Sequence, residues 1–273
     1  MRSLFGYQDK NTPIHQLNAV AKLVYFLVTT VAVMLTYDLR LIIVVSVVSL
    51  IALKVAQVDW QDVSFVVKFM TFFSVLNLVT IFLLSPQYGE RLYGSRTVLL
   101  ELGYYTVTAQ QLFYELNVLV KYFATIPLVI LFILTMNPSD FAASFNRLGV
   151  PYRVAYSISL TLRYIPDIQR DYFNIRNAQA ARGVVGDGKV SLIQKIGRTL
   201  KLIFPLILTS FNRIETISQA MMLRRFGRGK QRTWYVARPM QARDYYVILL
   251  AFGWLGLVGL FYWLNQGRFY NPF

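Results

Sequence analysis

Five long apolar stretches alternate with more polar segments along the chain. They cover approximately residues 17–37, 41–56, 63–84, 112–135 and 245–264. A helix needs about 20 apolar residues to cross the hydrocarbon core of a bilayer, and each stretch comes close to that length. Aromatic residues crowd the ends of the stretches, as is typical of membrane interfaces. The pattern predicts an all-α membrane protein with about five transmembrane helices.

The segment between the fourth and fifth stretches has a different pattern. It predicts three amphipathic helices that lie along a membrane face or pack on other helices. The first begins at Asn137 and Pro138, a cap residue followed by proline, and ends at Gly149. The second covers about residues 152–182 and the third about 190–225.

Apolar residues recur at steps of three and four along the two longer helices, which gives each helix one apolar stripe. Pro166 and Pro205 lie inside them and are expected to bend them. We expect the stripes to pack against other helices through Ile158, Leu162, Ile165, Ile196, Leu200, Ile203, Ile207 and Phe211.

Charge orients the predicted helices. The chain carries a formal net charge of +15, and residues 138–244 hold 18 of the 28 Lys and Arg against six Asp and Glu, a net +12. Because basic segments favour the cytoplasmic side of a membrane, we expect residues 137–244 and the N-terminus in the cytoplasm and the C-terminus outside.

These boundaries predict three parts: an N-terminal bundle of four spans at 1–136, a coupling domain at 137–232, and a final span with its tail at 233–273. The bundle includes an external loop at about 85–111. Within this loop the sequence RTVLLELGYYTVTAQQ predicts two short strands around Gly103, followed by a capping box that pairs Thr108 with Gln111.

One stretch resembles a phosphate-binding loop, because Gly183, Gly188 and Lys189 fit the spacing G-x-x-x-x-G-K. Such a loop needs Ser or Thr after the lysine and a buried strand before the first glycine. Here Val190 follows the lysine, and an amphipathic helix precedes the glycine. We therefore interpret the glycines as a turn between two helices.

Both long helices end in arginine followed by a turn. The second ends at Ala181, Arg182 and Gly183, and the third at Leu223, Arg224 and Arg225. An arginine at a helix C-terminus can be structural, since it interacts favourably with the last carbonyl groups. The repetition at two ends, together with the excess positive charge, favours docking into acidic grooves, where arginine binds carboxylates with two hydrogen bonds.

Over most of its length, and most specifically from Met136 to Gly183, the chain resembles the transmembrane T component of energy-coupling factor (ECF) transporters, which import vitamins and metals. The resemblance rests on the Asn-Pro, Leu-Gly-Val-Pro, Leu-Arg-Tyr-Ile-Pro and Ala-Gln-x-Ala-Arg-Gly sequences together. A second Ala-Arg motif of the family corresponds to residues 220–225, where Leu223 replaces the usual alanine. Arg224 aligns with the motif arginine, and Arg225 is its neighbouring alternative.

The resemblance implies a scaffold rather than an enzyme. In the family the T component joins two cytoplasmic ATPase subunits to a separate membrane protein, the substrate-binding S component. The two arginine motifs dock on the ATPases, which carry out the hydrolysis. No cofactor and no metal site is implied for this chain.

Two other interpretations compete with this one. A conventional ABC importer permease that lines its own pore would have a single coupling helix. A basic membrane anchor would explain the charge but not the paired motifs. The chain has no cysteine and one histidine, which argues against a thiol enzyme or a histidine-based metal site. The basic segment has no nucleic-acid-binding fold, so we expect a lipid bilayer and proteins as partners.

Overall fold

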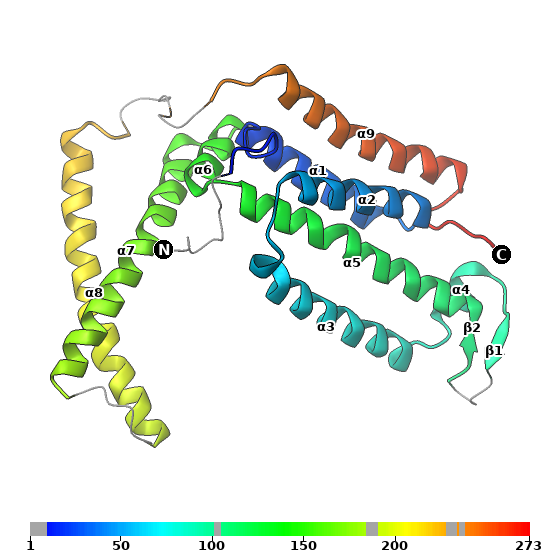
Figure 1. Ribbon diagram of the computed structural model, residues 1–273, viewed down its shortest axis with the longest axis horizontal. Coiled ribbons are helices and arrows are strands. Elements are labelled where there is room, and N and C mark those ends of the chain that lie inside the picture. Colours follow the sequence, from blue (N-terminus) through cyan, green and yellow to red (C-terminus); the bar gives the residue numbers. More distant parts are fainter. Residues whose placement is uncertain (1–9, 101–104, 184–190, 228–233, 235–237) are drawn as a thin grey trace. The chain divides into compact units, whose positions relative to one another are not determined.

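A computed structural model describes residues 10–100, 105–183, 191–227, 234 and 238–273. Within these ranges the chain is mostly helical, which confirms the predicted all-α class. The chain forms two compact units: residues 1–137 with 238–273, and residues 138–237. Figure 1 labels the elements of each.

The first unit is a bundle of five long apolar helices. Its core lies where α1, α2, α5 and α9 meet, around side chains such as Val33, Ile42, Leu128 and Trp254. α5 packs on α1, α2 and α3, and α9 packs on α1. The helices are α1 (Ala19–Leu35), α2 (Leu39–Val55), α3 (Trp60–Leu84), α5 (Ala109–Thr135) and α9 (Ala242–Leu264).

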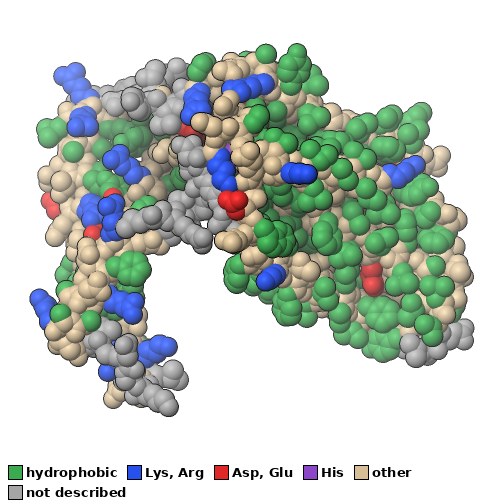
Figure 2. All heavy atoms as spheres, in the orientation of Figure 1, with side chains coloured by type: hydrophobic (Ala, Val, Ile, Leu, Met, Phe, Trp, Pro, Cys, Tyr) green, Lys and Arg blue, Asp and Glu red, His purple; other side chains and the backbone are tan. Residues whose placement is uncertain are grey.

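Helix length separates these five helices into two groups. In the described ranges, three combine sufficient length and apolarity to cross a membrane: Val63–Leu84 within α3, α5 and α9. α1 and α2 have 17 residues each, about 26 Å of helix, which is shorter than the hydrocarbon core of about 30 Å. The predicted first span, 17–37, extends two residues beyond α1 at each end. Hydrophobic side chains cover much of the visible surface of this unit (Figure 2).

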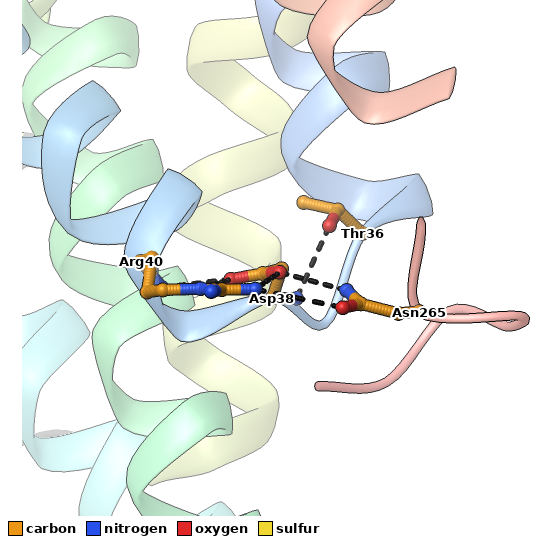
Figure 3. Close-up of polar contacts among 4 residues, drawn as sticks. All are labelled: Thr36, Asp38, Arg40 and Asn265. Carbon is orange, nitrogen blue, oxygen red and sulfur yellow. Dashed lines mark hydrogen bonds and ion pairs between the residues drawn. The ribbon is translucent and has the colours of Figure 1, made fainter. Parts of the chain in front are cut away.

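A polar cluster joins α9 to the turn between α1 and α2 (Figure 3). Asp38 caps α2 and is almost fully buried. Its carboxylate accepts hydrogen bonds from Arg40 (2.9 Å) and from the amide of Asn265 (2.8 Å). Burial alone would raise the pKa of Asp38, but these hydrogen bonds and the charge of Arg40 outweigh it, so the pKa lies below its usual value.

The opposite end of the bundle has its own polar cluster. The buried carboxylate of Asp244 accepts the backbone N–H of Asn18 at 2.8 Å and that of Gln241 at 2.7 Å. It thereby joins the beginnings of α1 and α9. Two buried aspartates thus fix the two ends of the α1–α9 pair.

The segment before α5 forms a short helix and a hairpin. α4 (Tyr88–Tyr93) is followed by the two predicted short strands, β1 (Val98–Leu100) and β2 (Val107–Thr108), which pair antiparallel. Thr108 accepts the backbone N–H of Gln111, but the predicted capping box is only half formed. The Gln111 side chain instead accepts the N–H of Gly89 at 2.8 Å. This bond requires α4 to lie very close to α5.

The second unit consists of α6 (Pro138–Arg147), α7 (Tyr152–Ala181) and α8 (Leu192–Leu223). Gly149 has a φ of +102° and ends the first of these helices, as the sequence predicts. α7 and α8 run unbroken through Pro166 and Pro205. With 30 and 32 residues, each is about 45 to 48 Å long.

Candidate docking tips of the long helices

α7 ends in a left-handed glycine turn. Arg182 is the C-cap, with φ −85° and ψ 3°, and its N–H donates to the carbonyl of Ala178. Gly183 follows with φ +71° and donates to the carbonyl of Ala180 at 2.9 Å. This backbone favours glycine, since a Cβ is strained at positive φ. All three motif residues, Ala181–Gly183, are exposed.

α8 ends with the same backbone geometry. Arg224 is its C-cap, with φ −84° and ψ 13°. Arg225 follows with φ +54°, and its N–H donates to the carbonyl of Met222 at 3.0 Å. Arg225 therefore occupies the position that corresponds to Gly183, and Arg224 is the structural equivalent of Arg182. Leu223, at the motif's first position, is 85% exposed.

The two tips lie at opposite ends of the helix pair, because α7 and α8 run antiparallel. Arg153, near the beginning of α7, donates to the carbonyl of Gly227 at 2.7 Å. Farther along, Asp171 accepts from Arg213 at 2.6 Å. Extending this register places the end of α7 beside α8 near residue 200, so about 24 residues of helix, or about 36 Å, separate the tips along the axis of α8.

Aromatic side chains hold the α8 tip against the base of α7. The ring of Phe226 packs against that of Tyr156, with centroids 4.7 Å apart, and against that of Tyr152 at 5.8 Å, each at a tilt of about 45°. Trp234 completes the group and donates its indole N–H to Asn146 of α6 at 3.0 Å. We call Tyr152, Tyr156, Phe226 and Trp234 the aromatic clamp. At the α7 tip, no described atom apart from those of the adjacent residues lies within 4 Å of the point where a Cβ on Gly183 would be.

An ion pair connects α7 and α8 near the middle of the two helices. The Arg213 guanidinium bonds to Asp171 and also lies 5.9 Å from the ring centre of Tyr164. Both charged side chains are only about a quarter to a third exposed, so this pair is less screened by water than a surface ion pair. The sequence pattern gave no sign that Arg213 and Asp171 are partners.

The predicted packing residues divide into two sets. Ile158, Leu162 and Ile165 of α7 are partly buried. Those of α8 are exposed, with Phe211 at 63%. They form one stripe, which we call the open face of α8: Ile196, Leu200, Ile203, Ile207 and Phe211. Among the α8 side chains that the structure describes, the buried one is Leu202, which the predicted stripe omitted.

An apolar cavity of about 480 Å³ lies between α7 and α8 near the second tip. Ile165 and Ile168 line it from α7, and Ile217 and Met221 line it from α8. The predicted glycine turn after Gly183, with Gly188 and Lys189, falls outside the described residues. Within those residues, no three His, Asp or Glu side chains group as a metal ion would require.

Comparison with known proteins gives a consistent result. A family described as cobalt transport protein matches residues 10–235. A protein from Streptococcus equi subsp. equi, named energy-coupling factor transporter transmembrane protein EcfT, is 25% identical over 253 residues, which cover 89% of this chain and 90% of that protein. A protein of the same name from Bacillus selenitireducens is 27% identical over 237 residues, 84% and 85% of the two chains.

Proposed function

The chain belongs to the cobalt transport protein family and resembles EcfT along most of its length, and from that premise we propose how this energy-coupling T component works. Two cytoplasmic ABC ATPases dock on the tips of α7 and α8. A membrane S component, which binds the substrate, packs on the open face of α8. The chain itself hydrolyses nothing and carries the motion of the ATPases to the S component.

The equivalence of the two tips is the observation that carries this proposal. Arg182 and Arg224 have nearly the same backbone angles, and each precedes a residue with positive φ. A matched pair of ATPases would require two matched contacts. Arginine suits acidic grooves because its guanidinium can donate two parallel hydrogen bonds to one carboxylate. Arg224, rather than Arg225, is then the main contact at the second tip.

The open face of α8 supports the contact with the S component. Five large apolar side chains at helical spacing are exposed there, a larger apolar patch than a solvated helix normally carries. An apolar helix of a partner membrane protein would bury this face. On the α7 side, Ile165 lines the apolar cavity between the two helices.

In this proposal the antiparallel pair of α7 and α8 converts a change in the distance between the two tips into a tilt of α8. When ATP closes the ATPase dimer, the two tips move relative to one another. Pro166 and Pro205 each remove one backbone hydrogen bond from the helix interior, so they are the points where the helices bend most easily. The resulting motion of α8 turns the S component between its outward and inward states.

The distribution of charge supports the sidedness of the chain. The +12 of residues 138–244 supports a cytoplasmic location for this segment and for the N-terminus, with the C-terminus outside. We infer uptake of a vitamin, a related micronutrient or a metal ion. The S component selects the substrate, so no residue of this chain is assigned to substrate binding.

Co-purification tests the proposal. The tagged chain is expressed with the paired ATPases of its host, as wild type and as Arg182→Glu, Arg224→Glu and the double variant. Arg176→Glu, an exposed charge reversal on the same α7, is the matched control. We expect the wild type and the control to retain two ATPases and the double variant to lose both. Retention of both by the double variant, with normal membrane insertion, would contradict the docking.

A further inference from the structure

A second cavity lies within the first unit, between the end of α1 and the facing sides of α3 and α5. Its volume is about 560 Å³, which falls within the range of about 300–1,000 Å³ that is typical of small-molecule sites and is too small for a transmembrane helix. The wall from α3 is apolar and aromatic, with Phe69, Met70 and Phe73, and Ile126 of α5 continues it.

Lys121 of α5 lines this cavity and is only 8% exposed. Its ammonium donates to the carbonyl of Met34 at 3.2 Å and lies 3.2 Å from the ring centre of Tyr37. Among the described residues no carboxylate forms an ion pair with it. The contact with Met34 caps the C-terminal end of α1 and uses one of three donors. A buried cation in a membrane-spanning helix is costly without an anionic partner, so it marks a candidate binding site.

Other polar groups accompany the cation. Asn77 of α3 and the phenol of Tyr114 line the same cavity. Asn77 is exposed on a helix that is otherwise apolar on most sides, and an amide in hydrocarbon needs a hydrogen-bond partner. The charge of Arg268 acts on Lys121 as well, and this increases the positive potential. The cavity therefore combines apolar walls with a cation and hydrogen-bond donors.

We propose that this cavity binds an anionic phospholipid. The lipid phosphate accepts hydrogen bonds from Lys121 and Asn77, and part of an acyl chain lies against Phe69, Phe73 and Ile126. The site is accessible from the bilayer because α3 packs chiefly on α5 and leaves most of its surface exposed. A bound lipid would also fill the gap beside α3 and so stabilise the position of this helix.

Native mass spectrometry of the intact chain tests the site. The protein is reconstituted into vesicles of equimolar phosphatidylglycerol and phosphatidylcholine, extracted, and analysed for retained lipid. We expect wild type to retain phosphatidylglycerol over phosphatidylcholine by at least about tenfold, because both lipids offer a phosphate to Lys121 but the choline ammonium of phosphatidylcholine adds a like charge near the lysine. Equal retention of the two lipids would overturn the proposal.

Three variants locate the site. Lys121→Met should lose the preference, whereas Lys68→Met, which removes an exposed lysine of α3 outside the cavity, should keep it. Because Lys121 also caps α1, Asn77→Leu provides a change at an exposed position and should weaken retention without loss of folding. Unchanged retention in both Lys121→Met and Asn77→Leu would overturn the proposal, as would an equal loss in Lys68→Met.

A phosphate titration distinguishes a lipid from a free anion. If the ligand is a lipid, inorganic phosphate should neither displace phosphatidylglycerol nor raise the melting temperature of the detergent-solubilised chain. If phosphate alone does both, and Lys121→Met abolishes the effect, the cavity is a site for a free anion and the lipid assignment is wrong.

Discussion

Replacement of Arg225 by glycine should stabilise the end of α8. Arg225 has φ +54° at the position where α7 has Gly183 with φ +71°. A residue with a Cβ loses about 1–2 kcal/mol in this left-handed conformation. Glycine avoids that cost but gives up about 0.5–1 kcal/mol through the greater freedom of the unfolded chain. The net gain for Arg225→Gly is about 0.5–1 kcal/mol.

Amide hydrogen exchange measures this gain locally. For a gain of 0.5–1 kcal/mol, exchange in the last turn of α8 should slow by about two- to fivefold in Arg225→Gly. Gly183→Ala is the matched control, because within 4 Å of the added Cβ the described part of the chain has no atom beyond the adjacent residues to obstruct it. Any destabilisation there comes from backbone conformation alone, and exchange at the end of α7 should become faster by a similar factor.

The same variant separates the two arginines of the second tip. If Arg224 makes the main contact, Arg225→Gly retains the ATPase and Arg224→Gly loses it. The reasoning is refuted if Arg225→Gly accelerates exchange at the end of α8 while Gly183→Ala slows exchange at the end of α7. Loss of the ATPase in Arg225→Gly alone would instead assign the contact to Arg225.

Three further changes test other parts of the structure. Gly89→Ala should destabilise the first unit by about 1–3 kcal/mol, measured as a lower melting temperature in detergent, because the new Cβ would lie 2.6 Å from the backbone of Gln110; an unchanged melting temperature would contradict the close packing of α4. Asp38 has a lowered pKa, so its stabilising effect is fully present above the usual value of 3.8 and is lost as pH falls through the lower folded-state pKa. The stability difference between wild type and Asp38→Asn should therefore shrink below about pH 4, and a difference that grows with acidity would contradict this. Pro166→Ala and Pro205→Ala should each slow substrate uptake by a reconstituted transporter, and unchanged uptake in both would argue against the prolines as bending points.

The helices were predictable from local patterns. Steps of three and four between apolar residues identified α7 and α8 almost to their ends, and Gly149 marked the end of α6. The two short strands before α5 were also predicted, on either side of Gly103, which itself lies outside the described residues. These features depend on neighbours in the sequence, which is why a single sequence contains them.

Features that depend on distant residues were not predictable. Gln111 could satisfy either the N–H of Thr108 or that of Gly89, and only the approach of α4 favours the second. The contact of Arg213 with Asp171 depends on the antiparallel register, which the turn between the helices does not specify. The aromatic clamp gave a weak signal, since Phe226 and Trp234 follow the second tip in an otherwise polar segment.

The equivalence of Arg182 and Arg224 rests partly on the local sequence pattern and partly on the structure. The sequence identified two arginine-containing helix ends and left the choice between Arg224 and Arg225 open. Backbone angles resolve the correspondence, because Arg225 occupies the left-handed position. The open face of α8 also required the structure, since an apolar stripe can face either a neighbouring helix or a partner.

Site-specific crosslinking tests the central claim most directly. The chain has no cysteine, so single cysteines at Arg182, Arg224 and the control position Arg176 can each carry a photoactivatable crosslinker in the assembled transporter. We predict one crosslinked ATPase from position 182, one from position 224, and none from position 176. The absence of ATPase adducts from both tips in an intact complex would contradict the claim.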